Sequence, residues 1–389
     1  MLLNLQQSLI DRVLAHLAAR TTDLAPSERK VPVENYFSSK RFELEQRSIF
    51  QQRPVVAALS AMLQRPGDFS ALDLGGVPVL LSRDRQGKVH AHVNACRHRG
   101  TKLVWQAQGS DMHTFTCPYH AWSYSNDGAL LGIPHGHCFP NLKKNDHNLI
   151  PLPVEERFGL IWVLPQPKAN LDLSGFLDHS LSGISEDLKA LELEHHIVFK
   201  PHERNWRANW KVLADGGLET YHFRVVHQRS IYPFFFDNLL VFDRFSHHQR
   251  LVLPKRSIAE LAKVERNQWN LRSHANLIYF LFPNIVLLIQ PDHIAVVAIS
   301  PISVSESRIT VAMLIPQSNT IEKDVEYWEK NRQITISALD EDFIVGEKIF
   351  EGARSIAFPH FVFGRNELGI SAFHESLEKI IMEQEKEPG

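Results

Sequence analysis

Two cysteine–histidine pairs stand close together in the first third of the chain. Cys96 is followed by His98, and Cys117 is followed by His120. Two thiolates and two imidazoles can bind a tetrahedral zinc ion, or a [2Fe–2S] cluster with cysteine on one iron and histidine on the other. The chain holds three cysteines and 21 histidines in 389 residues, so chance does not account for two such pairs. These four residues are therefore predicted to form a metal centre.

A second group of possible ligands lies near the middle of the chain. His222 and His227 follow the acidic residues Asp215 and Glu219. On a regular α-helix, a separation of five residues rotates a side chain by about 140°, so the two imidazoles would not share a face. Both can reach one metal ion if the helix ends or bulges between them. Spacing alone thus leaves open a metal site and a pair of unrelated histidines.

The first group of ligands lies in a region that is predicted to be mostly β. Val77–Leu81 and Val89–Val93 are expected to be strands joined by a turn, and Phe158–Leu164 a further strand that ends at the proline-rich linker 165–168. Each Cys–His pair then lies in a turn after a strand, where one loop can present two ligands.

The second group lies in a region of mixed type. Asn209–His227 has helical character, Ala275–Ser300 reads as strands broken by Pro283 and Pro291, and a long helix is expected from about Ile321 to Ala353. Strands bracketed by helices predict an α+β domain with its sheet wrapped around a long helix.

The composition excludes several classes of protein. With 42 basic and 44 acidic residues the formal charge is −2, which argues against nucleic acid as the main partner. Three cysteines are too few for a disulfide framework and favour a reducing compartment. The most apolar stretch, Leu277–Ile289, is too short to cross a bilayer. We therefore expect a soluble, cytoplasmic protein that begins with an amphipathic helix over Met1–Arg20.

The first group of ligands resembles the Rieske family. Two segments carry the resemblance: 94–100, which reads NACRHRG, and 117–124, which reads CPYHAWSY. It implies a [2Fe–2S] cluster at Cys96, His98, Cys117 and His120, because a zinc ribbon does not call for the arginine, glycine, tryptophan and tyrosine around them. The family usually has glycine at the position of Ala121.

Cys138 has no partner motif, and we expect it to be a buried or incidental thiol.

The second group resembles the iron-binding segment of Rieske non-haem iron oxygenase α subunits, on the run from 209 to 227 that reads NWKVLADGGLETYHFRVVH. The resemblance implies Fe(II) held by His222, His227 and a distant carboxylate, with open positions for O₂ and substrate. It also implies three parts: an N-terminal helix and arm over residues 1–44, an all-β Rieske domain over 45–165, and an α+β helix-grip catalytic domain over 166–389.

The third ligand should lie on the late helix, where Asp340, Glu341 and Asp342 are consecutive. Helical neighbours of Asp342 are apolar, and an ionised carboxylate there is costly unless a charge compensates it. Iron would be that charge. We therefore expect Asp342 to be the ligand, with Asp340 as the alternative. The family's acid pair followed by a glutamate also matches Glu341, Asp342 and Glu347.

Two further acids are assigned from the resemblance. Glu219 would connect His222 with His120 of a neighbouring subunit; an exposed glutamate that merely supports a helix is the alternative. Asp215 stands where many relatives carry asparagine near the iron, and it is included among the candidate catalytic residues.

The chain has no glycine-rich dinucleotide motif, so NAD(P)H is expected to serve only indirectly, through a separate reductase or ferredoxin. The expected reaction is hydroxylation, or oxidative dealkylation, of a small organic molecule by a homotrimer. Aromatic and quaternary ammonium substrates both stay open. The expected walls of the substrate pocket are aromatic: Phe234, Phe235, Phe236, Tyr279, Phe280 and Phe282.

Three functions remain possible on the residues alone. The first is an oxygenase, which includes an aromatic-ring dihydroxylating dioxygenase α subunit. The second is a Rieske electron carrier without oxygenase activity, and the third is a zinc-stabilised ligand-binding protein. Iron, sulfide and zinc content would separate the three.

Overall fold

The computed structural model describes residues 2–168, 171–320, 323–355 and 358–386. The chain forms two compact units. The first comprises Gln46–His179 and Glu192–His195; the second comprises Met1–Glu45, Ser180–Leu191 and His196–Gly389. The units do not follow the expected ranges 1–44, 45–165 and 166–389, because the N-terminal segment packs with the second half of the chain. Its strand β1 (Arg29–Pro32) pairs with β20 (His360–Phe363).

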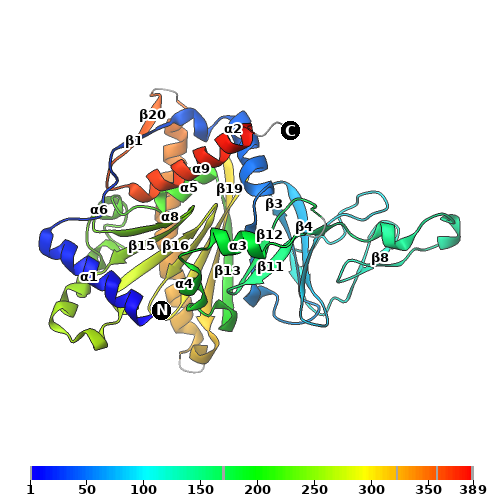
Figure 1. The fold of residues 1–389 in the computed structure, drawn as a ribbon, viewed down its shortest axis with the longest axis horizontal. Coiled ribbons are helices and arrows are strands. Elements are labelled where there is room, and N and C mark those ends of the chain that lie inside the picture. Colours follow the sequence, from blue (N-terminus) through cyan, green and yellow to red (C-terminus); the bar gives the residue numbers. More distant parts are fainter. Residues whose placement is uncertain (1, 169–170, 321–322, 356–357, 387–389) are drawn as a thin grey trace. The chain divides into compact units, whose positions relative to one another are not determined.

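The first unit is built from short antiparallel strands, as expected (Figure 1). Three sheets have the strand orders β10-β5-β4-β3-β6, β11-β12-β2 and β7-β8-β9. The strands are β2 Val55–Leu59, β3 Phe69–Leu74, β4 Val77–Arg83, β5 Val89–Val93, β6 Gln108–Gly109, β7 Thr114–Thr116, β8 Ser123–Ser125, β9 Leu130–Gly132, β10 Pro151–Leu152, β11 Val154–Arg157 and β12 Leu160–Val163. The helix α3 (Ser174–Ser180) follows them.

The predicted strands β4 and β5 are confirmed, with the turn between them. The strand expected at Phe158–Leu164 is shorter, because Phe158 and Gly159 take positive φ values of 54° and 72° in the turn before it. A core around Cys96 and Cys117 also contains Trp122 and Tyr124. The aromatic side chains flanking the ligands therefore belong to the structure that holds the loops.

The second unit is built on a seven-stranded antiparallel sheet with the order β13-β19-β18-β17-β16-β15-β14. Its strands are β13 His196–Trp206, β14 Val241–Phe245, β15 His248–Pro254, β16 Ala275–Leu281, β17 Ile285–Ile289, β18 Ile294–Ser303 and β19 Glu306–Pro316. The expected strands over 275–300 are confirmed: β16, β17 and β18 form a meander whose turns contain Pro283 and Pro291. Valine, isoleucine and leucine dominate these strands, as expected for a sheet that is covered on both faces.

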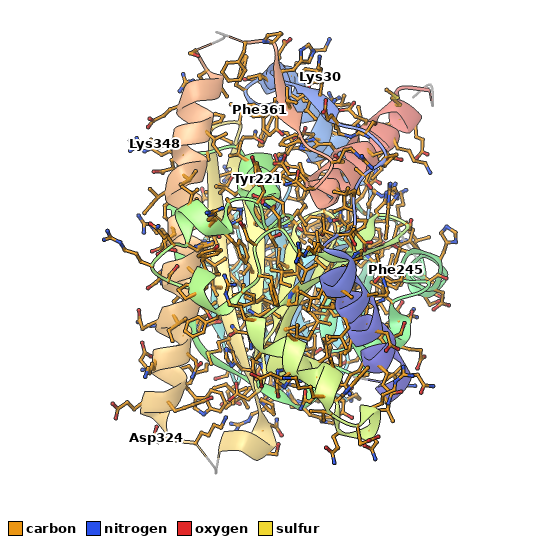
Figure 2. All side chains as sticks on the ribbon, turned by 90° about the vertical axis from the view of Figure 1, so that its left-hand side faces the viewer. Lys30, Tyr221, Phe245, Asp324, Lys348 and Phe361 are labelled. Carbon is orange, nitrogen blue, oxygen red and sulfur yellow. The ribbon has the colours of Figure 1, made fainter. Side chains whose placement is uncertain are left out.

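Helices cover the sheet and connect its strands. They are α1 Leu3–Ala19, α2 Ser39–Glu45, α4 Ser185–Lys189, α5 Trp210–Gly216, α6 Phe223–Val226, α7 Leu271–His274, α8 Val325–Ala353 and α9 Leu368–Lys386. The expected N-terminal helix is α1, whose Leu9, Ile10 and Val13 are buried. The expected long helix is α8, capped by the side chain of Asp324. Figure 2 shows α8 along its length, from Asp324 at one end to Lys348 near the other.

No helix in the described ranges combines the length and the apolar character needed to cross a bilayer.

Candidate metal centres and active site

The two Cys–His loops of the first unit repeat one backbone pattern. The N–H of Cys96 donates to the carbonyl of Thr101 (2.8 Å), and the N–H of Cys117 donates to that of Trp122 (2.8 Å). The residue four positions after each cysteine donates back to the cysteine carbonyl and has positive φ: Gly100 at 75° and Ala121 at 57°. Alanine tolerates this left-handed conformation less well than glycine does. Replacing the family's usual glycine by Ala121 thus has a local backbone cost.

The ligands of these loops form a buried sulfur side and an open imidazole side. Cys96 and Cys117 are buried, whereas His120 is exposed and His98 is half-buried. The imidazole rings of the two histidines lie 4.7 Å apart, centroid to centroid. Burial and the nearby Cys96 sulfur raise the pKa of the Cys117 thiol, which the backbone N–H groups of Tyr119 and His120 oppose.

This pairing fits a [2Fe–2S] cluster better than one zinc ion. Ligands of a single tetrahedral zinc lie within about 4 Å of one another. In the described part of the chain, three possible ligand atoms that all lie within 4.8 Å of one another are found in the second unit. The two cysteines and two histidines of the first unit contain no such set among the described residues. In a Rieske cluster the two cysteines bind one iron and the two histidines bind the other. Neighbouring thiols and neighbouring imidazoles fit that arrangement.

Two aromatic residues support the cluster loops. The indole of Trp122 stacks on the imidazole of His98, with ring centroids 4.9 Å apart and planes 8° apart. The Tyr124 hydroxyl lies 3.4 Å from the Cys96 sulfur and accepts a hydrogen bond from the N–H of Arg97 (3.0 Å). Both side chains therefore hold ligand residues of the loops in place. Cys138, by contrast, is exposed, so of the two expected alternatives the buried thiol is wrong and the incidental thiol remains.

In the second unit, His222, His227 and Asp342 come together. Nε2 of His222 lies 3.2 Å from Nε2 of His227, and the two nitrogens lie 3.2 and 3.0 Å from Oδ1 of Asp342. All three ligand atoms lie within 4.8 Å of one another. The set of two imidazoles and one carboxylate is typical of non-haem Fe(II) sites.

The backbone explains how two histidines five residues apart can meet. The helix expected over 209–227 is broken: α5 ends at Gly216, and α6 is a single turn with His222 at its N-cap and His227 at its C-cap. His227 is no longer in a helical conformation, with φ −96° and ψ 20°. One helical turn therefore lies between the two ligands, and it ends at the second ligand instead of continuing through it.

Carboxylates hold both imidazoles in one orientation. Glu219 Oε1 accepts a hydrogen bond from Nδ1 of His222, and Glu341 Oε2 accepts one from Nδ1 of His227 at 2.6 Å. The Ser230 hydroxyl also donates to Glu341 (2.6 Å). Because each Nδ1 donates its proton to a carboxylate, each Nε2 presents a lone pair toward Asp342.

Three electron-pair donors that face one another need a cation. Without one, only added protons can relieve the repulsion. Burial acts to lower the pKa of His222, but the hydrogen bonds that its imidazole donates to Asp342 and Glu219 raise this pKa to about 10. Burial likewise acts to raise the pKa of Asp342. The hydrogen bonds and charges of the two histidines outweigh it and lower this pKa below its usual range. A divalent metal ion satisfies the same groups without protonation, so the residues present fit an iron site.

The neighbouring acids of α8 lie elsewhere. Asp340 pairs with Arg204 on the surface (3.2 Å), and Glu347 accepts from the N–H of Arg207 (2.8 Å). Asp340, the alternative third ligand, is therefore not near the imidazoles. The contact of Glu341 with His227 could not be read from the sequence.

Glu219 is buried and lies between helices. The alternative of an exposed glutamate that supports a helix is therefore wrong, because Glu219 is buried and residues 217–222 are not helical. Its second oxygen accepts from the N–H of His222 (3.2 Å) and from that of Tyr221. Tyr221 itself is 59 % exposed beside α8 (Figure 2).

Asp215 belongs to a buried triad. The Tyr36 hydroxyl donates to its Oδ2 (2.8 Å), and His374 Nε2 lies 2.9 Å from its Oδ1 and 2.9 Å from the Tyr36 oxygen. Asp215 is not among the residues that line the cavity beside the metal ligands. Tyr36 and His374 gave no signal in the sequence, since they come from opposite ends of the chain.

A cavity of about 130 Å³ opens beside the ligands, between α8 and one face of the sheet. Its lining is largely leucine, isoleucine and valine, and it contains the rings of Phe223, Phe235 and Phe343. Of the described residues that were expected to form aromatic walls, Phe235 lines it. Tyr279 points to the other face, where its hydroxyl donates to Asp187 (3.1 Å), and Phe234 is 64 % exposed.

Two family models match the chain. The model of the Rieske [2Fe-2S] domain matches residues 53–144, and that of the ring hydroxylating alpha subunit (catalytic domain) matches residues 192–383.

Curated relatives include oxygenases of several substrates. The chain is 31 % identical over 230 residues to the glycine betaine monooxygenase oxygenase subunit of Chromohalobacter salexigens, a match that covers 57 % of this chain and 49 % of the relative. It is 30 % identical to the carnitine monooxygenase oxygenase subunit of Acinetobacter baumannii, over 56 % and 57 % of the two chains. The chain thus spans about half the length of these relatives. The match to the choline monooxygenase of Spinacia oleracea is 27 % identical and covers 92 % of this chain and 80 % of the relative.

Solved structures share the fold over most of the chain. A quaternary ammonium Rieske monooxygenase superposes with a TM-score of 0.78 at 20 % identity, covering 90 % of this chain and 95 % of the other. A naphthalene 1,2-dioxygenase from Rhodococcus superposes with a TM-score of 0.72 at 17 % identity, covering 98 % and 99 %.

Proposed function

Because this chain belongs to the family of Rieske oxygenase α subunits, we propose that it uses O₂ to hydroxylate, or oxidatively dealkylate, a small organic molecule. The observation that carries the proposal is the convergence of His222, His227 and Asp342 at one end of a largely apolar cavity. A simple electron carrier has no need of such a site. Electrons would come from a separate reductase or ferredoxin.

The chain's own residues would divide the work as follows. Cys96, Cys117, His98 and His120 would hold the [2Fe–2S] cluster, and His222, His227 and Asp342 would hold Fe(II). The iron supplies O₂ activation when it is bound. Glu219 and Glu341 fix the imidazole rings through their Nδ1 protons, and the apolar lining keeps water from the reacting carbon.

We propose that electrons pass between subunits of a homotrimer, from His120 of one chain to Glu219 and His222 of the next. The exposed side of His120 supports this route, as does the exposed Tyr221 beside Glu219. Inter-subunit electron transfer is described for a quaternary ammonium Rieske monooxygenase of the same fold. We place the enzyme in the cytoplasm, because the cluster needs two cysteines that stay reduced.

The bridge is tested by Glu219→Gln, which keeps the size of the side chain and removes its charge. We expect both metals to stay bound and turnover to fall by at least about a hundredfold. Glu347→Gln is the matched control, since Glu347 lies on the same helix as Asp342 and pairs with the backbone N–H and the guanidinium of Arg207 (2.8 and 3.9 Å). Unchanged turnover in Glu219→Gln would reject the bridge.

The inter-subunit route is tested by mixing two inactive variants. Cys96→Ser should lack the cluster, and Asp342→Ala should lack the iron. Co-expressed chains should regain part of the activity if the cluster of one subunit serves the iron of another. Activity that stays absent in mixed oligomers containing both variants would contradict the route.

A further inference from the structure

The cavity has two chemically different ends, and α8 connects them. Thr335, Ala338, Leu339 and Asp342 all line the cavity and lie on one face of the helix. Thr335 precedes Asp342 by two turns, which places it about 10 Å away along the axis. The metal ligands therefore occupy one end of the cavity, and a hydroxyl group occupies the other.

The sheet adds two amides to the end that holds Thr335. Leu277 on β16 pairs with Ile289, the last residue of β17, so Asn276 and the following Gln290 are neighbours, and both line the cavity. Gln290 Nε2 donates to the Thr335 hydroxyl oxygen at 3.0 Å. This leaves the Thr335 O–H free to donate and the side-chain carbonyl oxygen of Gln290 free to accept.

Asn276 is the least satisfied member of this group. No described residue lies within hydrogen-bond distance of its side-chain amide, although the side chain is half-buried among leucine, isoleucine and valine. A polar group in such surroundings is stabilised by a partner that enters the cavity.

This end carries no charge. Among the described residues that line the cavity, the titratable ones are Glu219, His222, His227 and Asp342, all at the metal end. Arg272 reaches Gln290 only at its main-chain carbonyl, to which Nε and Nη2 donate at 2.8 and 2.6 Å, and it does not line the cavity. A carboxylate bound here would lose its hydration without gaining a cation.

We propose that Asn276, Gln290 and Thr335 select a substrate whose group remote from the metal is uncharged and hydrogen-bonding, such as an amide, carbonyl or hydroxyl. The inference rests on the proposed function, because it takes the His222 end as the site of oxidation. The cavity volume of about 130 Å³ suits an apolar body of one ring, since a protein cavity of about 150 Å³ holds benzene. Glycine betaine and carnitine, which appear in the names of two relatives, carry a carboxylate instead.

Three probes of one shape test this selection: 4-methylbenzamide, 4-methylbenzoate and p-xylene. They share the ring and the methyl group and differ at the remote position. Dissociation constants are measured on the iron-loaded protein without O₂, so that no turnover occurs. We expect the amide to bind about tenfold tighter than either other probe. Equal or tighter binding of 4-methylbenzoate or of carnitine, or no binding by any of the three probes, would overturn the inference.

Two variants assign the selection to these residues. Thr335→Val and Asn276→Leu keep the side-chain size and remove hydrogen-bonding groups, so each should weaken amide binding by about tenfold and leave p-xylene within about twofold. Thr310→Val makes the same chemical change on β19 outside the cavity and should alter neither constant. An unchanged ratio of amide to p-xylene affinity in both cavity variants would contradict the assignment.

The two proposals fail in different ways. Binding that follows the expected order without any oxidation under turnover conditions would refute the proposed function alone. Oxidation of 4-methylbenzoate with no preference for the amide would refute the selection alone.

Discussion

The two candidate metal centres differ in how their ligands are brought together. In the first unit, each loop supplies a cysteine and a histidine within three residues, and one hydrogen-bond pattern shapes both loops. In the second unit, His222 and His227 meet a carboxylate more than a hundred residues later on α8. The first centre is encoded by local turn geometry, whereas the second depends on a broken helix and on helix packing.

The centres also differ in exposure. His120 lies on the surface, whereas His227 is 1 % exposed and Asp342 lines an apolar cavity. An exposed imidazole edge suits electron exchange with another protein, and an enclosed carboxylate site suits chemistry that must exclude water. Substitutions should therefore separate the centres cleanly.

The largest expected effect comes from Asp342→Ala. Removing the carboxylate leaves two imidazoles, so iron content should fall by one atom per chain and turnover should be abolished. The visible spectrum of the cluster should be unchanged. Asp340→Ala is the control, because Asp340 pairs with Arg204 on the surface. Loss of the cluster spectrum in Asp342→Ala would show that the two centres are not independent.

A stability effect confined to the first unit should follow from His92. Burial, together with the charge of His90, lowers the pKa of His92 to about 4, whereas an unfolded histidine titrates near 6.5. Between these values the unfolded chain binds the additional proton. Stability should therefore be complete above pH 6.5 and fall by up to about 3 kcal/mol as the pH drops to 4.

This slope is measured by denaturant unfolding at a series of pH values, followed by the cluster absorbance. His92→Gln should flatten the dependence, whereas His137→Gln, an exposed histidine of the same unit, should preserve it. An equally steep fall in His92→Gln would assign the slope to other groups.

A smaller effect is expected at the iron site from Glu341→Gln. The amide is a weaker acceptor for Nδ1 of His227 and holds the ring less firmly. Loss of such a supporting hydrogen bond typically weakens metal binding by about 10- to 100-fold, which iron competition with a chelator would measure. Glu347→Gln should leave the affinity unchanged, and an unchanged affinity in Glu341→Gln would mean that the contact does not orient the imidazole.

The smallest effect should come from the cluster loops. Ala121→Gly relieves a positive φ of 57°, so the first unit should gain about 1 kcal/mol in the free energy of unfolding. The reverse change in the sister loop, Gly100→Ala, should cost a similar amount, because Gly100 has φ 75° and open space around it. A destabilising Ala121→Gly would show that the two loops are not equivalent.

The sequence predicted the loops and strands of the first unit because their signals are local. Alternation in β4 and β5 and the spacing within each Cys–His pair need no knowledge of distant residues. The choice of Asp342 over Asp340 also came from local pattern, since apolar helical neighbours mark the face that turns inward.

Other parts depend on tertiary contacts and could not be predicted. The break between α5 and α6, the contact of Glu341 with His227, and the triad of Tyr36, Asp215 and His374 all join segments far apart in the chain. Of the expected aromatic walls Phe235 lines the cavity, whereas Tyr279 does not, because β16 alternates its faces and turns Ile278 toward the cavity instead. Asn276 was detectable in principle as a polar residue inside an apolar strand.

The count of iron, zinc and acid-labile sulfide per chain in protein purified without O₂ tests the central claim most directly. We predict about three irons and two sulfides in the unaltered chain, and about two of each in Asp342→Ala. Two irons in the unaltered chain, or zinc in place of iron at the cysteines, would contradict the account of two linked iron centres on one chain.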